Sequence, residues 1–198
     1  FPTRRSSDLA QYYQQLGLTP DTDTATALLY GLKMDTLQFT RGVTQEDISA
    51  FAFLFPLCDQ ETLARLERNN MEFNDLKAYG AAIESIVLYD KTGFSSVSFP
   101  CPDALVAILS DFILALQEVE VAVVFSFRED GIKFSVRSED PRIHAGNLVH
   151  SALQGLGDGG GHAEMAGGLI RLEAVPKLGR YPNDAIRDAF LAALSIQR

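Results

Sequence analysis

The stretch VEVAVVFSFREDGIKFSVRS, Val119 to Ser138, decides the fold. Its first nine residues are mostly apolar, β-branched or aromatic, which is typical of a central strand covered on both faces. Asp130-Gly131 then supplies a hairpin signal. After it, apolar residues alternate with polar ones that include Ser135 and Arg137, so one face of the second strand is polar. We therefore expect two adjacent strands inside a sheet, joined by a tight turn.

The segments on either side of this hairpin predict a mixed domain. Two shorter strands precede it, around the turn DKTG, and one strand follows it. Period-3.6 apolar patterns and cap residues predict helices between them. The predicted strands are Ile83–Tyr89, Phe94–Phe99 and Leu169–Val175, and the predicted helices are Asp103–Leu116, Ala145–Leu153 and Asp184–Ile196, the last capped by Asn183. The fold class is therefore α/β, a mixed β-sheet with flanking helices.

The first third of the chain is predicted to be helical. The expected helices are Ala25–Phe39, Gln45–Phe55 after the cap Thr44, and Gln60–Arg68 after the cap Asp59. In the first of them Asp35 lies on the apolar stripe. Burying an ionised carboxylate is costly and ends in protonation, ion pairing or metal ligation, so Asp35 is a candidate metal ligand. A hydrogen-bonding role in the core or at a helix end is the commoner alternative.

Composition excludes several classes of protein. The chain has 198 residues, a net charge of −9 and no Trp, which disfavours a broad electrostatic surface for long nucleic acid or anionic lipid. The longest apolar helix is too short and too charged to span a membrane. Two distant cysteines give neither a disulfide framework nor a zinc motif, so a reducing cytoplasm is the expected location.

The glycine-dense segment GLGDGGGHAEMAGG, Gly155 to Gly168, is the strongest local signal. Packing alone does not require so many glycines. Gly159–Gly161 can bring bare backbone N–H groups close to an anion, and His162 is expected to open a short helix whose N-terminus favours negative charge. This describes a phosphate or nucleotide-end cradle, although neither a Walker A nor a dinucleotide motif applies. The alternative is a flexible surface loop.

Arg137 is the natural companion of this cradle, because its planar guanidinium suits a phosphate. The alternative is an ion pair with a nearby acid such as Glu139. His144 and His150 have no metal-like spacing and are expected to be structural or surface residues.

Three motifs resemble the DHH-family phosphoesterases. GGGHAEMAGG resembles the glycine-rich signature of the domain that closes these enzymes, and SVRS, Ser135 to Ser138, resembles the Arg-containing strand before it. ATALLYGLKMDT, Ala25 to Thr36, is similar to the family's fourth metal-binding motif. The resemblance covers Ala10 to Arg198. It is closest to the nanoRNase branch, which degrades very short oligoribonucleotides and 3′-phosphoadenosine 5′-phosphate.

This resemblance implies roles for particular residues. Asp35 would be a ligand of a divalent metal, typically Mn²⁺, and Arg137, Gly160, Gly161 and His162 would hold the phosphate and terminal nucleotide of the substrate. It also implies a division of the chain. Residues 10–71 would be the remnant of the catalytic domain, 72–82 a linker helix, and 83–198 the substrate-binding domain.

The departures from the family are equally informative. Its earlier metal-binding motifs, including the Asp-His-His triplet, occur nowhere in this chain. A two-metal hydrolase needs several carboxylate and imidazole ligands, so this polypeptide alone is expected to be inactive. Its first nine residues, FPTRRSSDL, resemble a translated sequencing adapter, which would place a cut in a longer gene at Ala10.

Three functions therefore remain open. The leading one is a fragment of a metal-dependent phosphodiesterase that acts on short oligoribonucleotides or small nucleotides, with no membrane partner and a homodimer as one possible assembly. The second is a non-catalytic nucleotide-binding or assembly module. The third, a fragment of a RecJ-like single-strand exonuclease, fits the acidity and the lack of Trp less well.

Overall fold

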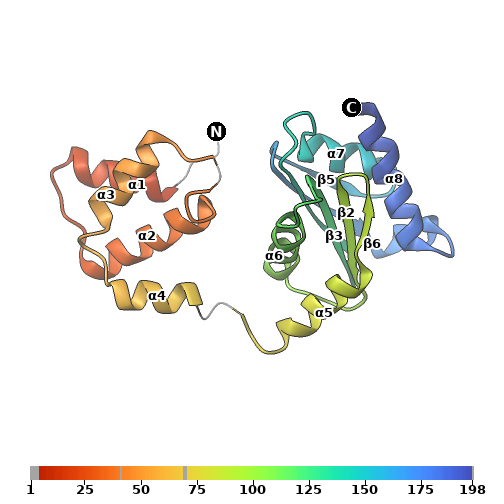
Figure 1. Ribbon diagram of the computed structural model, residues 1–198, viewed down its shortest axis with the longest axis horizontal. Coiled ribbons are helices and arrows are strands. Elements are labelled where there is room, and N and C mark those ends of the chain that lie inside the picture. The colour runs from red at the N-terminus through yellow and green to blue at the C-terminus, as the bar shows by residue number, and fades with distance from the viewer. Residues whose placement is uncertain (1–4, 41, 69–70, 198) are drawn as a thin grey trace. The chain divides into compact units, whose positions relative to one another are not determined.

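The computed structural model describes residues 5–40, 42–68 and 71–197. They form two compact units that divide after Glu72 (Figure 1). The elements of the first unit are α1 (Arg5–Gln15), α2 (Thr22–Asp35), α3 (Gln45–Leu54) and α4 (Gln60–Arg68). Those of the second are α5 (Asp75–Ser85), β1 (Val87–Tyr89), β2 (Thr92–Val97), α6 (Asp103–Leu114), β3 (Val121–Arg128), β4 (Gly131–Ser138), α7 (Ala145–Ala152), β5 (Asp158–Gly161), β6 (Met165–Arg171), the 3₁₀ helix η1 (Leu172–Leu178) and α8 (Pro182–Gln197).

Helix caps organise the first unit as the sequence predicts. Thr44 and Asp47 form a capping box at the start of α3, and the Asp59 carboxylate accepts the first backbone N–H groups of α4. A small apolar core joins the helices, with Leu29, Leu32 and Leu54 fully buried.

The first residues of α1 contribute to this unit. The hydroxyl of Ser7 donates a hydrogen bond to the buried carboxylate of Asp47, and Ala10 is fully buried. Residues 5–9 are therefore helical, although the adapter hypothesis excluded them from the fold. Residues 1–4 lie outside the described residues, and the origin of the segment stays a prediction.

The predicted helix Ala25–Phe39 is too long at its C-terminal end. Thr36 follows α2, and its hydroxyl donates to Leu32 O and accepts from Phe39 N. Leu37, Gln38 and Phe39 all have positive φ angles, so a right-handed helix cannot continue through them. Phe39 still reaches the core, where its ring packs edge-on against Phe51.

The second unit is built on a six-stranded sheet of order β1-β2-β3-β4-β6-β5. Only the pair β2–β3 is parallel among the strand pairs of the described residues, and α6 connects these two strands. The hairpin predicted at Asp130-Gly131 joins β3 and β4, which lie in the middle of the sheet. The sequence prediction of a mixed α/β domain is confirmed.

Helices cover both faces of the central strands (Figure 1). One face carries Ile132, Phe134 and Val136 and packs against α7 and α8. The other carries Ala122 and Val124 and packs against α5 and α6. Beyond β4, however, α6 no longer covers the second face, because its strand contacts are with β3 and β4.

Several predicted boundaries in this unit are wrong. Residues 83–85 continue helix α5, although the pattern predicted a strand from Ile83, and α5 buries Ala78 and Ala82 in the core of the sheet domain. The predicted strand Leu169–Val175 begins earlier and ends at Arg171, where η1 begins. Helix α8 begins before its predicted cap Asn183, whose side chain amide instead donates to the Ser96 hydroxyl.

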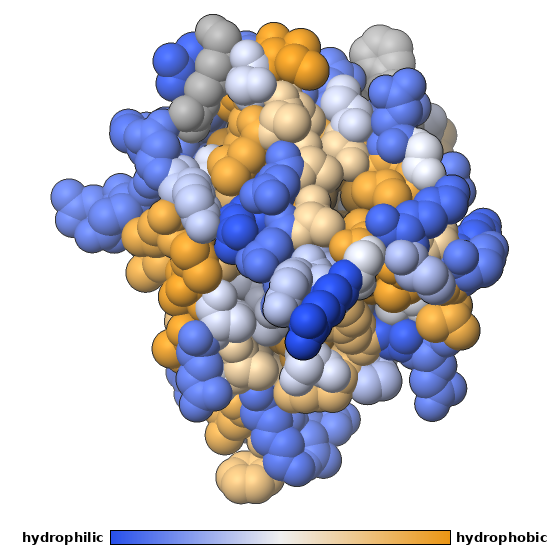
Figure 2. Space-filling view, turned by 90° about the vertical axis from the view of Figure 1, so that its right-hand side faces the viewer, coloured by the Kyte–Doolittle hydropathy of each residue, from blue (hydrophilic) through white to orange (hydrophobic). Residues whose placement is uncertain are grey.

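Hydrophobic and hydrophilic side chains are mixed on the surface of the molecule. Hydrophobic patches lie between hydrophilic ones on the face shown in Figure 2, and several large apolar side chains are exposed. Across the described ranges, no helix combines the length and the hydropathy that crossing a bilayer requires.

Candidate functional site

The glycine-dense segment is a β-hairpin. β5 and β6 pair in antiparallel fashion, with Gly160 opposite Gly167, and the backbone N–H of His162 donates to Met165 O to close the turn. His162 therefore starts no helix, and the predicted contribution of a helix N-terminus at this position is wrong. The glycine-dense segment forms two strands instead, because β5 pairs with β6 and β6 also pairs with β4.

Some of these glycines are needed for packing, contrary to the sequence argument. A Cβ at Gly168 would lie 2.5 Å from Cδ1 of Leu153, the C-cap residue of α7, and a Cβ at Gly159 would meet the Val149 side chain within that helix. On the helix side, a Cβ at Gly146 would collide with the carbonyl oxygen of Gly161. The close approach of α7 to β5 and β6 thus accounts for Gly146, Gly159 and Gly168.

Gly160 and Gly167 point to the opposite face, and packing does not account for them. A Cβ at Gly160 would have no atom within 4 Å, and one at Gly167 would only touch Phe134 O at 3.4 Å. The two residues are register partners in adjacent strands, so they leave a bare patch of backbone on the sheet. We call Gly160 and Gly167, with the flanking His162, the bare glycine surface.

The register brings most of the predicted binding residues to this surface. Arg137 pairs with Met165 across β4 and β6, and Met165 pairs with His162 at the hairpin end. These three residues therefore form one row on the face that includes Gly160 and Gly167, since directly paired residues share a face. Arg137 and His162 lie two strands apart, or about 10 Å. Gly161 belongs to the same hairpin but pairs with the buried Ala166 on the opposite face, and a Cβ there would lie 2.4 Å from Met165 O.

Arg137 is buried rather than open to solvent. Its Nε lies 2.6 Å from Asp111 Oδ1 of α6, and its Nη1 donates to Ser135 Oγ at 3.1 Å and to the Val136 carbonyl. The Ser135 hydroxyl in turn contacts the Ser110 hydroxyl at 2.8 Å. Arg137 has an acidic partner as the alternative interpretation expected, but that partner is Asp111 and not Glu139.

Sequence analysis missed Asp111 and Ser110 as members of this network. The available signal was an aspartate in the middle of a mostly apolar helix, α6. It did not identify the partner because α6 and β4 are brought together only by the packing of the helix on the sheet.

The apolar periodicity predicted that Asp35 is buried, and the structure does not confirm this burial. Asp35 is the exposed last residue of α2. Within residues 5–40, 42–68 and 71–197, no three His, Cys, Asp or Glu side chains form a group that could hold a metal ion. These residues do not by themselves fit a metal centre, and the role of Asp35 stays a prediction.

The two other histidines have structural or surface positions, as expected. His144 caps α7, its Nδ1 accepting the backbone N–H of Asn147, and His150 is exposed on the same helix.

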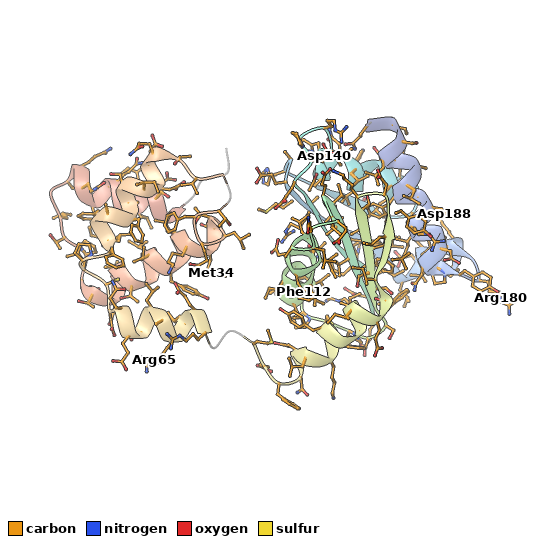
Figure 3. The ribbon with its side chains drawn as sticks, viewed as in Figure 1. Met34, Arg65, Phe112, Asp140, Arg180 and Asp188 are labelled. Atoms are coloured by element: carbon orange, nitrogen blue, oxygen red, sulfur yellow. The ribbon has the colours of Figure 1, made fainter. Side chains whose placement is uncertain are left out.

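A concave region lies at the start of α8. A pocket of about 530 Å³ is lined by Ser98, Phe127, Arg180, Tyr181, Pro182, Asn183 and Asp184. Figure 3 shows Arg180 extending away from the rest of the domain, and its guanidinium lies 5.5 Å from the Tyr181 ring centre. None of the predicted site residues lines this pocket.

Known proteins and protein families match different parts of the chain. An uncharacterized protein of Methanocaldococcus jannaschii is 28% identical over 207 residues, which is 97% of this chain and 41% of that protein. The chain thus spans about two fifths of the length of the curated relative it matches.

Two solved structures share the fold. The exopolyphosphatase-related protein from Bacteroides fragilis has a TM-score of 0.64 at 19% identity, covering 88% of this chain and 52% of that one. RecJ from Thermus thermophilus, solved in complex with Mg²⁺, has a TM-score of 0.51 at 17% identity, covering 92% of this chain and 36% of that one.

The family comparison is confined to the second unit. Residues 94–188 match the DHHA1 domain family. They include β4, β5, β6 and the helix α7 that packs beneath the glycines. By sequence, the part of the chain that carries Arg137, Gly160, Gly161 and His162 therefore matches the DHHA1 domain.

Proposed function

We propose that residues 73–198 are the substrate-binding domain of a DHH-type phosphoesterase that acts on short oligoribonucleotides or small nucleotides such as 3′-phosphoadenosine 5′-phosphate. The DHHA1 match and the phosphoesterase-like fold support the enzyme class. The observation that carries the binding role is the bare glycine surface. Two facing glycines leave room for a ligand where packing requires no gap.

The chemistry of this surface suits the end of a nucleotide. An edge strand offers a row of backbone N–H groups, and β5 is one of the two edge strands of the sheet. His162 adds an imidazole beside them, which donates a hydrogen bond in either protonation state. We assign the direct phosphate contact to His162 and the β5 backbone, because Arg137 already donates to Asp111 and Ser135.

Arg137 then acts mainly as a fixed positive group in the floor of the site. Its ion pair with Asp111 sets the orientation of the guanidinium before a ligand arrives, which lowers the entropy that binding must overcome. The net charge of −9 favours small substrates over long polyanions, since long strands gain affinity from extended positive surfaces.

A two-metal hydrolysis needs more ligands than the described residues bring together around one point. RecJ of T. thermophilus was solved with Mg²⁺. In our proposal a divalent ion, Mn²⁺, would activate the attacking water. We propose that residues outside these 198 supply most of its ligands. The M. jannaschii relative and the B. fragilis protein are each longer than this chain, which is consistent with this division.

Binding tests the role of the bare glycine surface directly. Titration of ¹⁵N-labelled protein with a 5′-phosphorylated dinucleotide should shift the amide signals of Gly160, His162 and Gly167. Gly160→Ala and Gly167→Ala should each weaken binding about 10-fold, because the new methyl group occupies the ligand's place.

The matched control is Gly80→Ala in α5, where a Cβ also has open space. It should leave affinity unchanged. Signal changes confined to the pocket at Arg180 and Tyr181, or equal affinity in all three variants, would remove the bare glycine surface from the proposal.

A non-catalytic nucleotide-binding module makes the same binding prediction but differs in activity. If the chain is part of an enzyme, a longer protein that contains it together with the proposed catalytic domain should hydrolyse the dinucleotide with Mn²⁺. In that protein, His162→Ala should lower kcat/KM without changing thermal stability. Binding without hydrolysis by the extended protein would favour the module.

A further inference from the structure

The start of α7 holds the tip of the β5–β6 hairpin. The tip residues His162 and Ala163 each accept a hydrogen bond through the backbone carbonyl. Gly146 N–H donates to His162 O at 3.0 Å, and Ala145 N–H donates to Ala163 O at 2.8 Å. Ala145 and Gly146 are the first two residues of α7. The His162 side chain is exposed, so the backbone hydrogen bonds of the tip largely determine where its imidazole lies.

These two hydrogen bonds use N–H groups that a helix cannot pair within itself. The N–H groups of the first three helical residues have no carbonyl of the same helix to donate to. In α7 the first two donate to the hairpin tip, and the third, that of Asn147, donates to His144 Nδ1 at 3.2 Å. The next N–H, that of Leu148, donates to His144 O at 2.9 Å inside the helix. The His144 imidazole is therefore the acceptor that completes the start of α7.

His144 is itself held by the end of α8. Its backbone N–H donates to Gln197 Oε1 at 3.0 Å. Its Nδ1 accepts the Asn147 N–H, so the ring is neutral and carries its proton on Nε2. An Asn side chain can supply the same acceptor at an N-cap, whereas Ala cannot. Substitution by Asn and by Ala therefore separates the acceptor from the other properties of the imidazole.

We propose that His144 is a positioning residue for nucleotide binding, which acts through the start of α7 on the hairpin tip that carries His162. This role rests on the proposed function, in which His162 contacts the ligand. Without the Nδ1 acceptor the first turn of α7 frays, because its third N–H loses its partner. Ala145 and Gly146 then no longer direct their N–H groups at the tip, and binding must order His162 at a cost in entropy.

The cap should affect the tip and not the rest of the site. Gly160 and Gly167 pair with each other within the β5–β6 ladder, and Arg137 is held by Asp111. None of these contacts uses the first turn of α7. Loss of the cap should therefore move His162 and leave the two glycines and Arg137 in place.

Amide hydrogen exchange of the ligand-free protein tests the link between His144 and the tip. In the ¹⁵N-labelled 198-residue chain, His144→Ala should speed exchange at Gly146 and His162 by about 5-fold, while Val123 in the middle of the sheet keeps its wild-type rate. His144→Asn should restore slow exchange. The matched control is His150→Ala, at an exposed position of the same helix, which should change neither rate. Equal exchange in His144→Ala and wild type overturns the proposal.

Nucleotide binding tests whether the position of the tip matters to the ligand. Titration with the 5′-phosphorylated dinucleotide should give about 5-fold weaker affinity for His144→Ala and nearly wild-type affinity for His144→Asn and His150→Ala. Thermal unfolding verifies that the variants are folded. If His144→Ala fails to fold, His144→Gly takes its place, because glycine also lacks the acceptor but suits the N-cap backbone.

The two possible failures are distinguishable. A wild-type protein that binds no dinucleotide overturns the proposed function, and the role of His144 in binding falls with it. A wild-type protein that binds, beside a His144→Ala variant of equal affinity, overturns the role of His144 alone. A loss of affinity that His144→Asn does not restore also contradicts the proposal, because the acceptor is then not what His144 contributes.

Discussion

Asp111 on α6 forms an ion pair with Arg137, the buried charged residue beside the candidate site. The Asp111–Arg137 ion pair is largely buried, with the arginine side chain 10% exposed, and Ser110 and Ser135 complete its hydrogen bonds. A partly buried arginine that loses its acid is left with an uncompensated charge, which costs more than the pair itself contributes.

Asp111→Asn should therefore destabilise the second unit by about 1–3 kcal/mol. Asp111→Leu combined with Arg137→Met should recover most of the loss, because both charges are removed together. Urea unfolding measures both effects. Glu139→Gln, at the acid that the sequence offered as a partner, should change stability by less than about 0.5 kcal/mol. Equal losses at Asp111 and Glu139 would contradict this assignment.

Substitution by alanine should lower stability at one of two adjacent glycines in β6 and leave it unchanged at the other. Gly168→Ala drives a methyl group against Leu153 and Val149, so it should lower the free energy of unfolding by about 1–3 kcal/mol. Gly167→Ala meets only ordinary contact and should leave stability within about 0.5 kcal/mol. Thermal melts of the two variants test whether α7 needs a glycine at position 168 in order to pack closely on β6. Similar melts would show that it does not.

At the scale of elements, α6 is held to the sheet at both ends by charge. Near its C-terminal end Asp111 pairs with Arg137, and at its start Asp103 lies 2.8 Å from Lys133 and also pairs with Arg128. The Lys133 ammonium foremost, and then the Arg128 guanidinium, hold the pKa of Asp103 below its usual range. Asp103 therefore links β3 and β4 to the helix that crosses them.

This link predicts a pH dependence. Because the folded-state pKa of Asp103 is lowered, its stabilisation is present above its unfolded pKa of about 3.9 and is lost as pH falls through the folded value. Asp103→Asn should lower the urea midpoint at pH 7, and the difference from wild type should shrink as pH falls below about 4. The exposed Glu84→Gln should show no such trend. If the difference in urea midpoint between Asp103→Asn and wild type stays constant with pH, the charge of Asp103 is excluded as its cause.

At the scale of the whole molecule, each unit has its own apolar core. Leu29, Leu32 and Leu54 belong to one cluster in the first unit, and the two clusters on either side of the sheet belong to the second. Separate cores predict separate cooperative unfolding.

Leu29→Ala should therefore lower the unfolding temperature of one calorimetric transition and leave the other unchanged, at a cost of about 2–5 kcal/mol. Phe134→Ala, in the sheet core, should lower the other transition. Residues 73–198 expressed alone should melt with the second transition and keep nucleotide binding. One transition shifted by both substitutions would mean that the units unfold together.

The sequence by itself determined the class of fold and most of its elements. The apolar run of β3, the Asp130-Gly131 turn and the caps Thr44 and Asp59 act through neighbouring residues, so local patterns were sufficient for them. The resemblance of the glycine segment, Gly159–Gly168, located the candidate binding residues, and the DHHA1 match covers that segment. It could not show which glycines serve packing and which leave open space, because that depends on where α7 lies.

Tertiary structure alone decided the remaining features. Asp111 meets Arg137 across 26 positions of sequence, and α2 ends at Asp35 because Thr36 and three left-handed residues follow it. β5, rather than β6, is the edge strand at its end of the sheet because these two strands are exchanged relative to their order in the chain. Each depends on contacts between segments far apart in sequence, or on a backbone conformation that apolar periodicity does not encode.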